Sequence, residues 1–360
     1  DCIDDTNRVR AGATGAVLGH QVMAPSTLGT FLRSFTFGHV RQLEAVVAKA
    51  IERAWGAGAG PTATLIVDVD STICQVHGYA KAGAAYGYTK VLGYHPLLAT
   101  RADTGEVLHA RLRKGSANTA RGIIRFIDEL LARVGRAGGG DAVIVRADSG
   151  FYQHKLLNRL SKAGVGFSVT IAQRQPVRVA IEAIPESAWQ RIDYPDGEAH
   201  VAECLYRNRR LIVRRVPGHR GAQGQLFTTW RYHAFVTNLA GTAWSLDRQH
   251  RAHAVVELSI RDLKAGGLAH LPSGSFNANS AWLQHAVLAH NLTRWTAQLG
   301  GHTTNQLMVA KTFRTRLLTI PGRLVNRSGQ PTLRLPARWP WADQFHSALD
   351  VLRTLPPVPG

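Results

Sequence analysis

Cysteine is scarce in this sequence, and long apolar runs are missing. The 360 residues contain three cysteines, Cys2, Cys74 and Cys204, and no two of them form the Cys-x-x-Cys pair that is typical of a zinc site. This odd, dispersed set indicates free thiols in a reducing compartment. No apolar run approaches the roughly 18 residues of a membrane span, and no signal peptide opens the chain. We therefore expect a soluble, cytoplasmic protein that has no membrane partner.

Several enzyme classes also lack their motifs here. No serine lies in a Gly-x-Ser-x-Gly sequence, and Ser273-Gly-Ser275 is turn-like without the strand-to-helix setting of a nucleophilic hydrolase. No Gly-x-x-x-x-Gly-Lys-Ser/Thr loop is present, so the sequence gives no support to an NTP-driven motor. A zinc enzyme is disfavoured because no His-Glu-x-x-His pattern accompanies the histidines at His250, His253, His270, His285 and His290.

Acidic residues are few for the number of basic ones. Lys and Arg total 43 against 24 Asp and Glu, which gives a formal net charge of +19 and a pI near 10.7. The excess is spread along the chain and is densest at residues 207–210, 214–215 and 314–316. Because a field this positive attracts polyanions and speeds their capture, we expect nucleic acid as the partner.

Strand and helix patterns alternate through most of the chain. Residues 63–70 and 142–148 are apolar runs bounded by turn residues, which predicts two buried strands that each end in an aspartate. Two further runs, 88–100 and 106–113, flank a turn and predict antiparallel hairpin neighbours of the first strand. The sequence also predicts a strand at 165–171 and helices at 38–55, 118–134 (capped by Asn118), 151–164, 279–298 and from Asp247 through Lys264.

Between about 171 and 238 the pattern changes to short, charged β-type segments. We interpret this stretch as a β-rich insertion into an α/β core with a mixed sheet. Because the chain begins at Asp1 without a methionine, we also expect that an upstream segment is missing. The expected organisation is a helical N-terminal segment at 1–60, a catalytic core at 61–170 and 240–300, an insertion domain at 171–239 and a C-terminal segment at 301–360.

Acids at the ends of the two buried strands are candidates for chemistry, because a buried acid is costly unless it is paired or binds metal. Asp68 and Asp70 lie on one face of the first strand, so either could serve, and Asp148 ends the other strand. Glu257 and Lys264, seven positions apart, would lie on one helical face. Three converging carboxylates could hold a pair of Mg²⁺ ions for phosphoryl transfer, while the lysine holds a phosphate.

Each acid also has a purely structural explanation. Asp148-Ser-Gly150 is a good turn sequence, and each aspartate could cap a turn. Glu257 lies among apolar neighbours in a helix that we expect to be largely buried, and Arg261, four positions later, could neutralise it. The residues alone leave these alternatives open.

Short motifs in a characteristic order extend over most of the chain. They are Ser26-Thr-Leu-Gly-Thr-Phe-Leu-Arg33, Asp68-Val-Asp-Ser-Thr72, Gly93-Tyr-His-Pro-Leu-Leu98, Arg146-Ala-Asp-Ser-Gly-Phe151, the helix with Glu257 and Lys264, Asn291-Leu292 and Pro321-Gly-Arg323. In order and spacing they resemble the DDE transposases of the IS4-like group, and most closely the IS1380 family of bacterial insertion sequences.

The resemblance implies a fold, a set of catalytic residues and a metal. The fold is an RNase H-like core, with a mostly β insertion between the second aspartate and the glutamate. Its first acid belongs to an Asp-x-Thr-like motif, which selects Asp70 over Asp68, and the second and third acids are Asp148 and Glu257. These three residues would be both catalytic and metal-binding, with Mg²⁺ as the metal and Mn²⁺ as a substitute.

The helix around Glu257 departs from the group's pattern. Resembling proteins have Tyr, two residues, Arg, three residues, Glu, six residues and Lys, whereas here histidines occupy the first two places. Members of the group can also flip a base and stack it on an aromatic side chain of the insertion, for which Trp230 and Trp189 are candidates, although core packing explains both. The expected DNA contacts are therefore His250, His253, Arg251, Arg261, Lys264 and Trp230.

Together these features predict a cut-and-paste transposase acting on double-stranded DNA. Water would attack a phosphodiester at the terminal inverted repeats of an insertion sequence, and the freed 3′-hydroxyl would attack target DNA; a hairpin intermediate is implied by resemblance alone. Synapsis of two ends implies at least a homodimer, associated with the bacterial nucleoid. The alternatives are a nuclease on the same core that cuts without joining, and a truncated or domesticated DNA-binding protein without activity.

Overall fold

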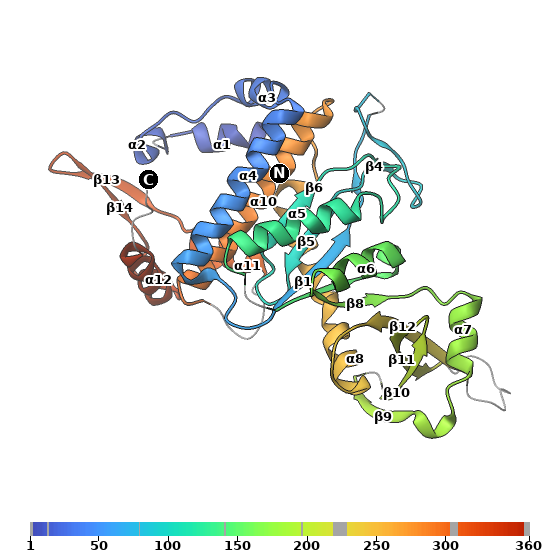
Figure 1. Ribbon diagram of the computed structural model, residues 1–360. Helices are drawn as coiled ribbons and strands as arrows, with labels where there is room; N and C mark the ends of the chain where they lie inside the picture. Colours follow the sequence, from blue (N-terminus) through green and yellow to red (C-terminus); the bar gives the residue numbers. More distant parts are fainter. Residues whose placement is uncertain are drawn as a thin grey trace, which may run out of the picture.

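A mixed β-sheet forms the backbone of the molecule (Figure 1). The computed structural model describes residues 3–12, 14–78, 80–139, 142–195, 197–218, 229–302 and 309–355, so that Cys2 lies outside the described residues. Within these ranges the sheet has nine strands in the order β6-β5-β1-β7-β8-β12-β11-β10-β9. They are β1 (Leu65–Ser71), β5 (Leu97–Arg101), β6 (Val107–Arg111), β7 (Val143–Ala147), β8 (Gly166–Thr170), β9 (Gln190–Tyr194), β10 (Gly197–Tyr206), β11 (Arg209–Pro217) and β12 (Trp230–Thr237).

Strand directions within this sheet are mixed. The strand β1 pairs antiparallel with β5 and parallel with β7, while β5 pairs antiparallel with β6 and β7 pairs parallel with β8. The predicted hairpin beside the first strand is therefore confirmed, but the run expected at 88–100 is too long, because Leu92–Tyr94 pairs in a separate three-stranded sheet. The hairpin turn uses Gly105 at φ 70°, a conformation that favours glycine. The expected α/β class with a large mixed sheet is also confirmed.

Long helices cover this part of the sheet. The helix α10 (Phe276–Leu299) packs against α4 (Phe37–Ala54) and β6, and α5 (Ile123–Arg136) packs against β6 and α6 (His154–Lys162). The buried face of α5 has the i, i+3, i+4 spacing of an amphipathic helix. Its members are Ile123, Phe126, Ile127, Leu130 and Val134.

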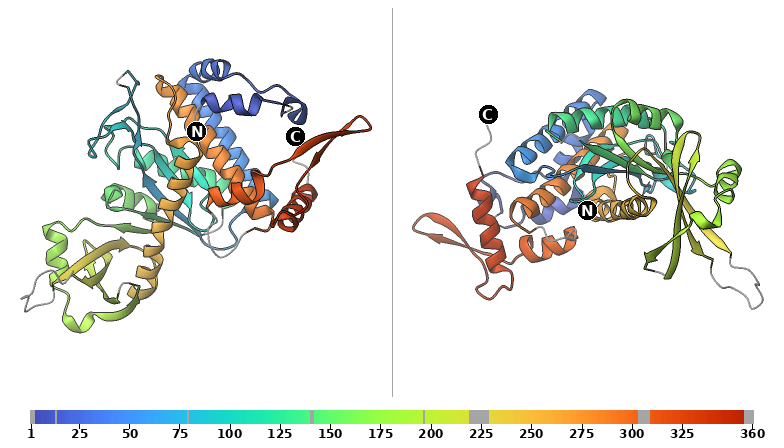
Figure 2. Two further views of the ribbon diagram at one scale, coloured as in Figure 1. Left: turned by 180° about the vertical axis from the view of Figure 1, so that it is seen from behind. Right: turned by 60° about the horizontal axis from the view of Figure 1, so that its bottom comes forward.

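The strands after β8 form a second lobe on the same sheet, at the end remote from α4 (Figure 1; Figure 2, left). Because β12 pairs antiparallel with β8, the sheet passes into this lobe without a break. The helix α8 (Ala243–Arg251) packs on β10 and β11, and α7 (Gln175–Glu182) packs on β10. The lobe has its own small apolar core of Ile192, Ala199, Val201, Ile212, Val216, Phe235 and Leu246.

Two helix predictions were wrong in detail. The helix expected from Asn118 begins at Ile123, because the Asn118 side chain accepts a hydrogen bond from the Ala120 amide and stabilises a turn instead. The single helix expected from Asp247 begins at Ala243, and its residues form separate segments. These are α8, a 3₁₀ segment (Ala252–Val255), α9 (Val256–Leu263) and a wider π turn (Lys264–Leu268).

A long-range contact explains the break after α8. The Gln249 carbonyl accepts a hydrogen bond from Arg146 on β7, so this carbonyl has a partner outside the helix. Sequence periodicity contains no signal for such a contact between residues so far apart along the chain.

The remaining elements surround the core. The C-terminal hairpin and α12 extend away from the second lobe in every view (Figure 2). No helix among the described residues is long and apolar enough to cross a membrane. These elements are α1 (Thr6–Arg10), α2 (Thr14–Leu18), α3 (Pro25–Arg33), β2 (Cys74–Gln75), β3 (Ala85–Tyr86), β4 (Leu92–Tyr94), α11 (Ala310–Phe313), β13 (Arg323–Arg327), β14 (Gln330–Arg334) and α12 (Ala342–Thr354).

Candidate active site

Asp70 and Asp148 are delivered to one place by two neighbouring parallel strands. The register pairs Val69 of β1 with Ala147 of β7, so the next residue on each strand is one of these aspartates. Asp70 Oδ1 accepts a hydrogen bond from the Ser71 amide at 2.6 Å, and Asp148 Oδ1 accepts one from the Gly150 amide at 3.0 Å. The carboxyl ends of parallel strands are where ligands bind in α/β sheets.

Burial makes the charged forms of Asp70 and Asp148 unfavourable unless a cation lies nearby. Burial raises the pKa of Asp70 to about 6, and the nearby carboxylates of Asp148 and Glu257 add to the rise, while His253 opposes it. Burial also raises the pKa of Asp148. Both side chains are thus disfavoured in their charged form by desolvation, and a bound cation would reverse that effect.

Glu257 lies at the edge of this cluster. It is exposed near the start of α9, is close enough to Asp70 to affect its pKa, and makes no hydrogen bond or ion pair within the described ranges. Among the described residues, no three His, Cys, Asp or Glu side chains converge as a ready-made metal site. The structure therefore brings Asp70 and Asp148 together and leaves Glu257 beside them with its side chain unengaged.

The donor set nevertheless fits a hard divalent cation. All three groups are carboxylates, the oxygen ligands that Mg²⁺ and Mn²⁺ prefer, and no thiol belongs to the set. The predicted alternative of a Glu257–Arg261 ion pair is not formed within the described residues, although both side chains are exposed on α9.

Asp68 is already committed to other partners. Its side chain is fully buried and is held at both oxygens by Arg146, at 2.6 and 2.8 Å, on the adjacent strand β7. His253 Nδ1 lies 2.8 Å from Asp68 Oδ1, and since a carboxylate accepts, the histidine donates. Asp70 is therefore the better candidate of the two, because both oxygens of Asp68 already accept hydrogen bonds from cationic or ring N–H groups.

His250 and His253, which stand where IS4-like transposases have Tyr and Arg, both contact other side chains of the protein. His253 contacts Asp68 and lies near Asp70 and Asp148. His250 uses both ring nitrogens on the hydroxyls of Ser168 and Thr170 of β8, and its ring stacks on Phe235 at 4.1 Å. Burial lowers the pKa of His250 to about 3, so it is neutral. The expected phosphate contact by His250 is at odds with this arrangement, because neither ring nitrogen is free.

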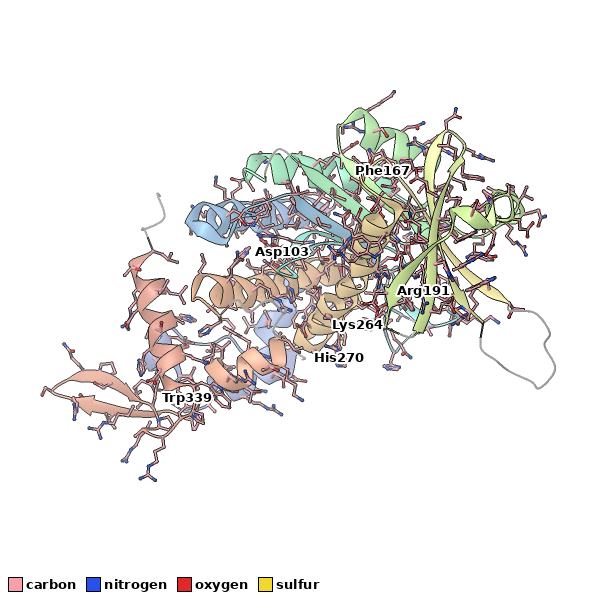
Figure 3. The ribbon with its side chains drawn as sticks, turned by 90° about the horizontal axis from the view of Figure 1, so that it is seen from below. Asp103, Phe167, Arg191, Lys264, His270 and Trp339 are labelled. Atoms are coloured by element: carbon pink, nitrogen blue, oxygen red, sulfur yellow. The ribbon has the colours of Figure 1, made fainter. Side chains whose placement is uncertain are left out.

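The other predicted DNA contacts have varied surroundings. Lys264, labelled in Figure 3 on the helical segment that follows α9, donates to the Ile73 carbonyl at 3.1 Å, three residues after Asp70. Arg251 pairs with Asp247 at 2.9 Å, whereas Arg261 is exposed.

Trp230 has a cationic neighbour that reasoning from sequence missed. The guanidinium of Arg215 lies 4.4 Å from its ring and 4.4 Å from that of Trp189, between the two.

Two further residues near the site were not predicted. Arg146 could have been found, because a buried cation within an apolar strand needs an acid, and Asp68 is its register partner on β1. His95 is buried, and its Nδ1 lies 2.9 Å from the Ala117 carbonyl, so Nδ1 carries the proton. Its Nε2 therefore accepts from the Ser71 hydroxyl at 2.9 Å, beside Asp70. The Gly93-Tyr-His motif was the available signal for His95.

A cavity opens beside the second aspartate. It has a volume of about 410 Å³ and is bordered by Ser149, the residue after Asp148. Aromatic faces and cations together are typical of surfaces that bind single-stranded nucleic acid. The side chains of those kinds that line it are Tyr152, Tyr206, His154, Arg174 and Arg207.

A family model matches almost the whole chain. The family model described as "Transposase DDE domain group 1" matches residues 1–357. No curated protein shows a significant match. Among solved structures, the chain is similar to the piggyBac transposase in a synaptic complex with hairpin DNA, with a TM-score of 0.43 and 11% identity. That match covers 69% of this chain and 51% of the piggyBac chain, so the chain spans about half the length of this solved structure.

Proposed function

Since this chain belongs to the DDE transposase family, by a family match over residues 1–357, we propose that it is a metal-dependent DNA transposase. It cleaves phosphodiester bonds at the terminal inverted repeats of an insertion sequence and joins the freed 3′-hydroxyl to double-stranded target DNA. The observation that carries this proposal is the placement of Asp70 and Asp148 at the ends of adjacent parallel strands, with Glu257 within electrostatic reach.

The catalytic residues of the proposal are Asp70, Asp148 and Glu257, which would hold the metal. Mg²⁺, for which Mn²⁺ can substitute, would stabilise charge on the attacking and leaving oxygens when it is bound. Backbone amides orient both aspartates: Ser71 donates to Asp70, and Gly150 donates to Asp148. Glu257 is exposed and has no hydrogen bond or ion pair with the described residues, so its side chain can turn inward to complete the set.

DNA contacts in the proposal follow from the cations and aromatic rings around the carboxylates. Lys264 and Arg261 would hold phosphates near the scissile bond, and Arg251 would contribute at the side of the second lobe. His253 would act mainly by orienting the site through Asp68, and His250 is retained as a contact only if its hydroxyl partners release it. Trp230 stays a candidate for stacking a base on the ring face opposite Arg215.

We propose the core fold, the narrower family and the oligomeric state on the same premise, that the chain is a DDE transposase. The strand order β6-β5-β1-β7-β8, with β1 antiparallel to β5 and parallel to β7, supports an RNase H-like core. The motifs support membership of the IS1380 family of bacterial insertion sequences, and hence a role at the nucleoid. A homodimer in the synaptic complex follows from the need to hold two DNA ends.

Replacement of the second aspartate tests the proposal. Asp148→Asn should abolish Mg²⁺-dependent cleavage of a terminal-repeat duplex while DNA binding persists. Asp128→Asn is the matched control, because Asp128 is a half-exposed aspartate on α5 that pairs with Arg159. Retained nicking by Asp148→Asn would reject the assignment of the site.

A strand-transfer assay separates the proposal from its rivals. With pre-cleaved ends, a transposase joins them to target DNA, whereas a nuclease on the same core cuts and does not join. Binding without either reaction would identify an inactive DNA-binding protein.

A further inference from the structure

A basic cleft lies at the N-terminus of α5, beside the edge strand β6 and its neighbour β5. It has a volume of about 270 Å³, and no acidic residue is among those that line it. Leu97 and Phe126 form its apolar floor. Its cations are Arg111, Arg113, Lys114 and Arg121.

The cations of this cleft differ in how far they are already neutralised. Arg111 pairs with Glu129 and Glu44, so its charge is compensated. Lys114 and Arg121 are exposed on the rim and form no ion pair within the described residues. A rim of two free cations over an apolar floor is therefore available to an anion from outside.

Arg113 gives independent support for an anion. It is 8% exposed, and its Nη1 donates to the carbonyls of Asn118, Thr119 and Arg121. Its Nη2, however, is buried without a hydrogen-bond partner in the part of the chain that the structure describes. A buried guanidinium nitrogen without an acceptor is costly, and an anion in the cleft that accepted from Nη2 would relieve that cost.

The helix terminus beside Arg121 adds to the positive potential. Gly122 precedes α5 at φ 79° and offers no side-chain acceptor to the first amides of the helix. The N-terminus of a helix attracts anions through these amides and the helix dipole. The helix has 14 residues, long enough to carry a full dipole at this end.

The loop that forms the cleft also supports both catalytic aspartates. Its Ala117 carbonyl binds His95, which holds Ser71 beside Asp70. Thr119 packs so closely on Gly150 that a Cβ there would lie 2.7 Å from its methyl group, and Gly150 holds Asp148. A ligand in the cleft would therefore contact a loop that also positions the neighbours of both aspartates.

We propose that this cleft binds a backbone phosphate of duplex DNA next to the cleavage site. The inference rests on the proposed function for the identity of the polyanion. Lys114 and Arg121 contact the phosphate from the rim, the amides of α5 face it, and Arg113 lies beneath it. The contact is independent of base sequence, because its donors reach phosphate oxygens and no base edge.

Salt-dependent DNA binding tests the proposal. The double variant Lys114→Gln/Arg121→Gln should weaken binding of a terminal-repeat duplex about tenfold, which corresponds to one charged hydrogen bond. It should also lower the slope of log affinity against log salt by about one, equally for terminal-repeat and unrelated DNA. The matched control is Arg136→Gln, which removes a cation from the far end of the same helix. An unchanged slope, or a loss confined to the terminal-repeat sequence, would overturn the proposal.

DNA duplexes in which one phosphate is made neutral can locate the phosphate that the cleft binds. Duplexes with a single methylphosphonate, placed in turn at each phosphate around the cleavage site, should reveal one position that weakens the wild type but not the double variant. If no position behaves in this way, the cleft does not hold a DNA phosphate. These binding assays need no cleavage, so a wild type that binds and never cuts refutes the proposed function while leaving this test intact.

Discussion

Asp68 and Arg146 form a buried, two-pronged ion pair across β1 and β7. They are register partners, their side chains are 0% and 2% exposed, and Arg146 Nε lies 2.6 Å from Asp68 Oδ1. Asp70 lies two residues further along β1, and Asp148 lies two residues after Arg146, just beyond the end of β7. The pair therefore holds in alignment the two strands that deliver Asp70 and Asp148, the carboxylates that we propose to be catalytic.

Arg146→Met should destabilise the protein by about 3–5 kcal/mol, because it leaves the Asp68 carboxylate buried without its main partner. The free energy of unfolding in urea measures this loss. Arg159→Met is the control, since it removes the same kind of side chain from an exposed pair with Asp128, where about 0–1 kcal/mol is expected. Equal losses in the two variants would contradict the structural role of the Asp68–Arg146 pair.

The sequence predicted the strands of the core better than the contacts that complete the site. Asp70 and Asp148 could be found because each ends an apolar run, and the register of β1 and β7 then follows from burial of that run. The break between α8 and α9 could not be found, since it depends on Gln249 and Arg146 meeting across the fold. The position of His95 depends likewise on Ala117, a carbonyl that no side-chain pattern reveals.

Glu106 should make stability depend on pH. It is fully buried, accepts hydrogen bonds from the indoles of Trp55 and Trp295 at 3.0 and 2.9 Å, and burial raises its pKa to about 7 from an ordinary 4.5. Because the folded state holds this proton more tightly than the unfolded state, the contribution of Glu106 is full below pH 4.5 and is lost as pH rises through about 7.

Glu106→Gln should remove that dependence. Between about pH 5 and 7 the wild-type free energy of unfolding should fall relative to the variant by up to about 1.4 kcal/mol per pH unit. Urea titrations across this range measure the difference, with Glu52→Gln as the control, at a partly exposed glutamate of α4 that pairs with Lys49. Parallel curves for the wild type and Glu106→Gln would show that Glu106 keeps an ordinary pKa.

His250 and Arg261 should separate stability from DNA binding. His250→Phe keeps the stacking on Phe235 but loses the hydrogen bonds to Ser168 and Thr170, so we expect a loss of about 1–3 kcal/mol in stability and an unchanged salt dependence of DNA binding. Arg261→Gln should do the reverse, lowering the salt slope by about one with little change in stability. If His250→Phe lowers the salt slope instead, its ring contacts phosphate after all.

Lys264 has two roles that one substitution can distinguish. Its ammonium donates to the Ile73 carbonyl at 3.1 Å, next to the strand end that holds Asp70, and it is also the cation proposed to hold a phosphate. Lys264→Met retains the aliphatic stem and removes the charge, so loss of a phosphate contact should raise KM for DNA cleavage and lower the salt slope by about one. The melting temperature should change little, because a partly exposed hydrogen bond contributes only about 1 kcal/mol. Lys49→Met, at an exposed lysine on α4 paired with Glu52, controls for the loss of one positive charge. A large drop in melting temperature with an unchanged salt slope would mean that Lys264 anchors Ile73 and does not touch DNA.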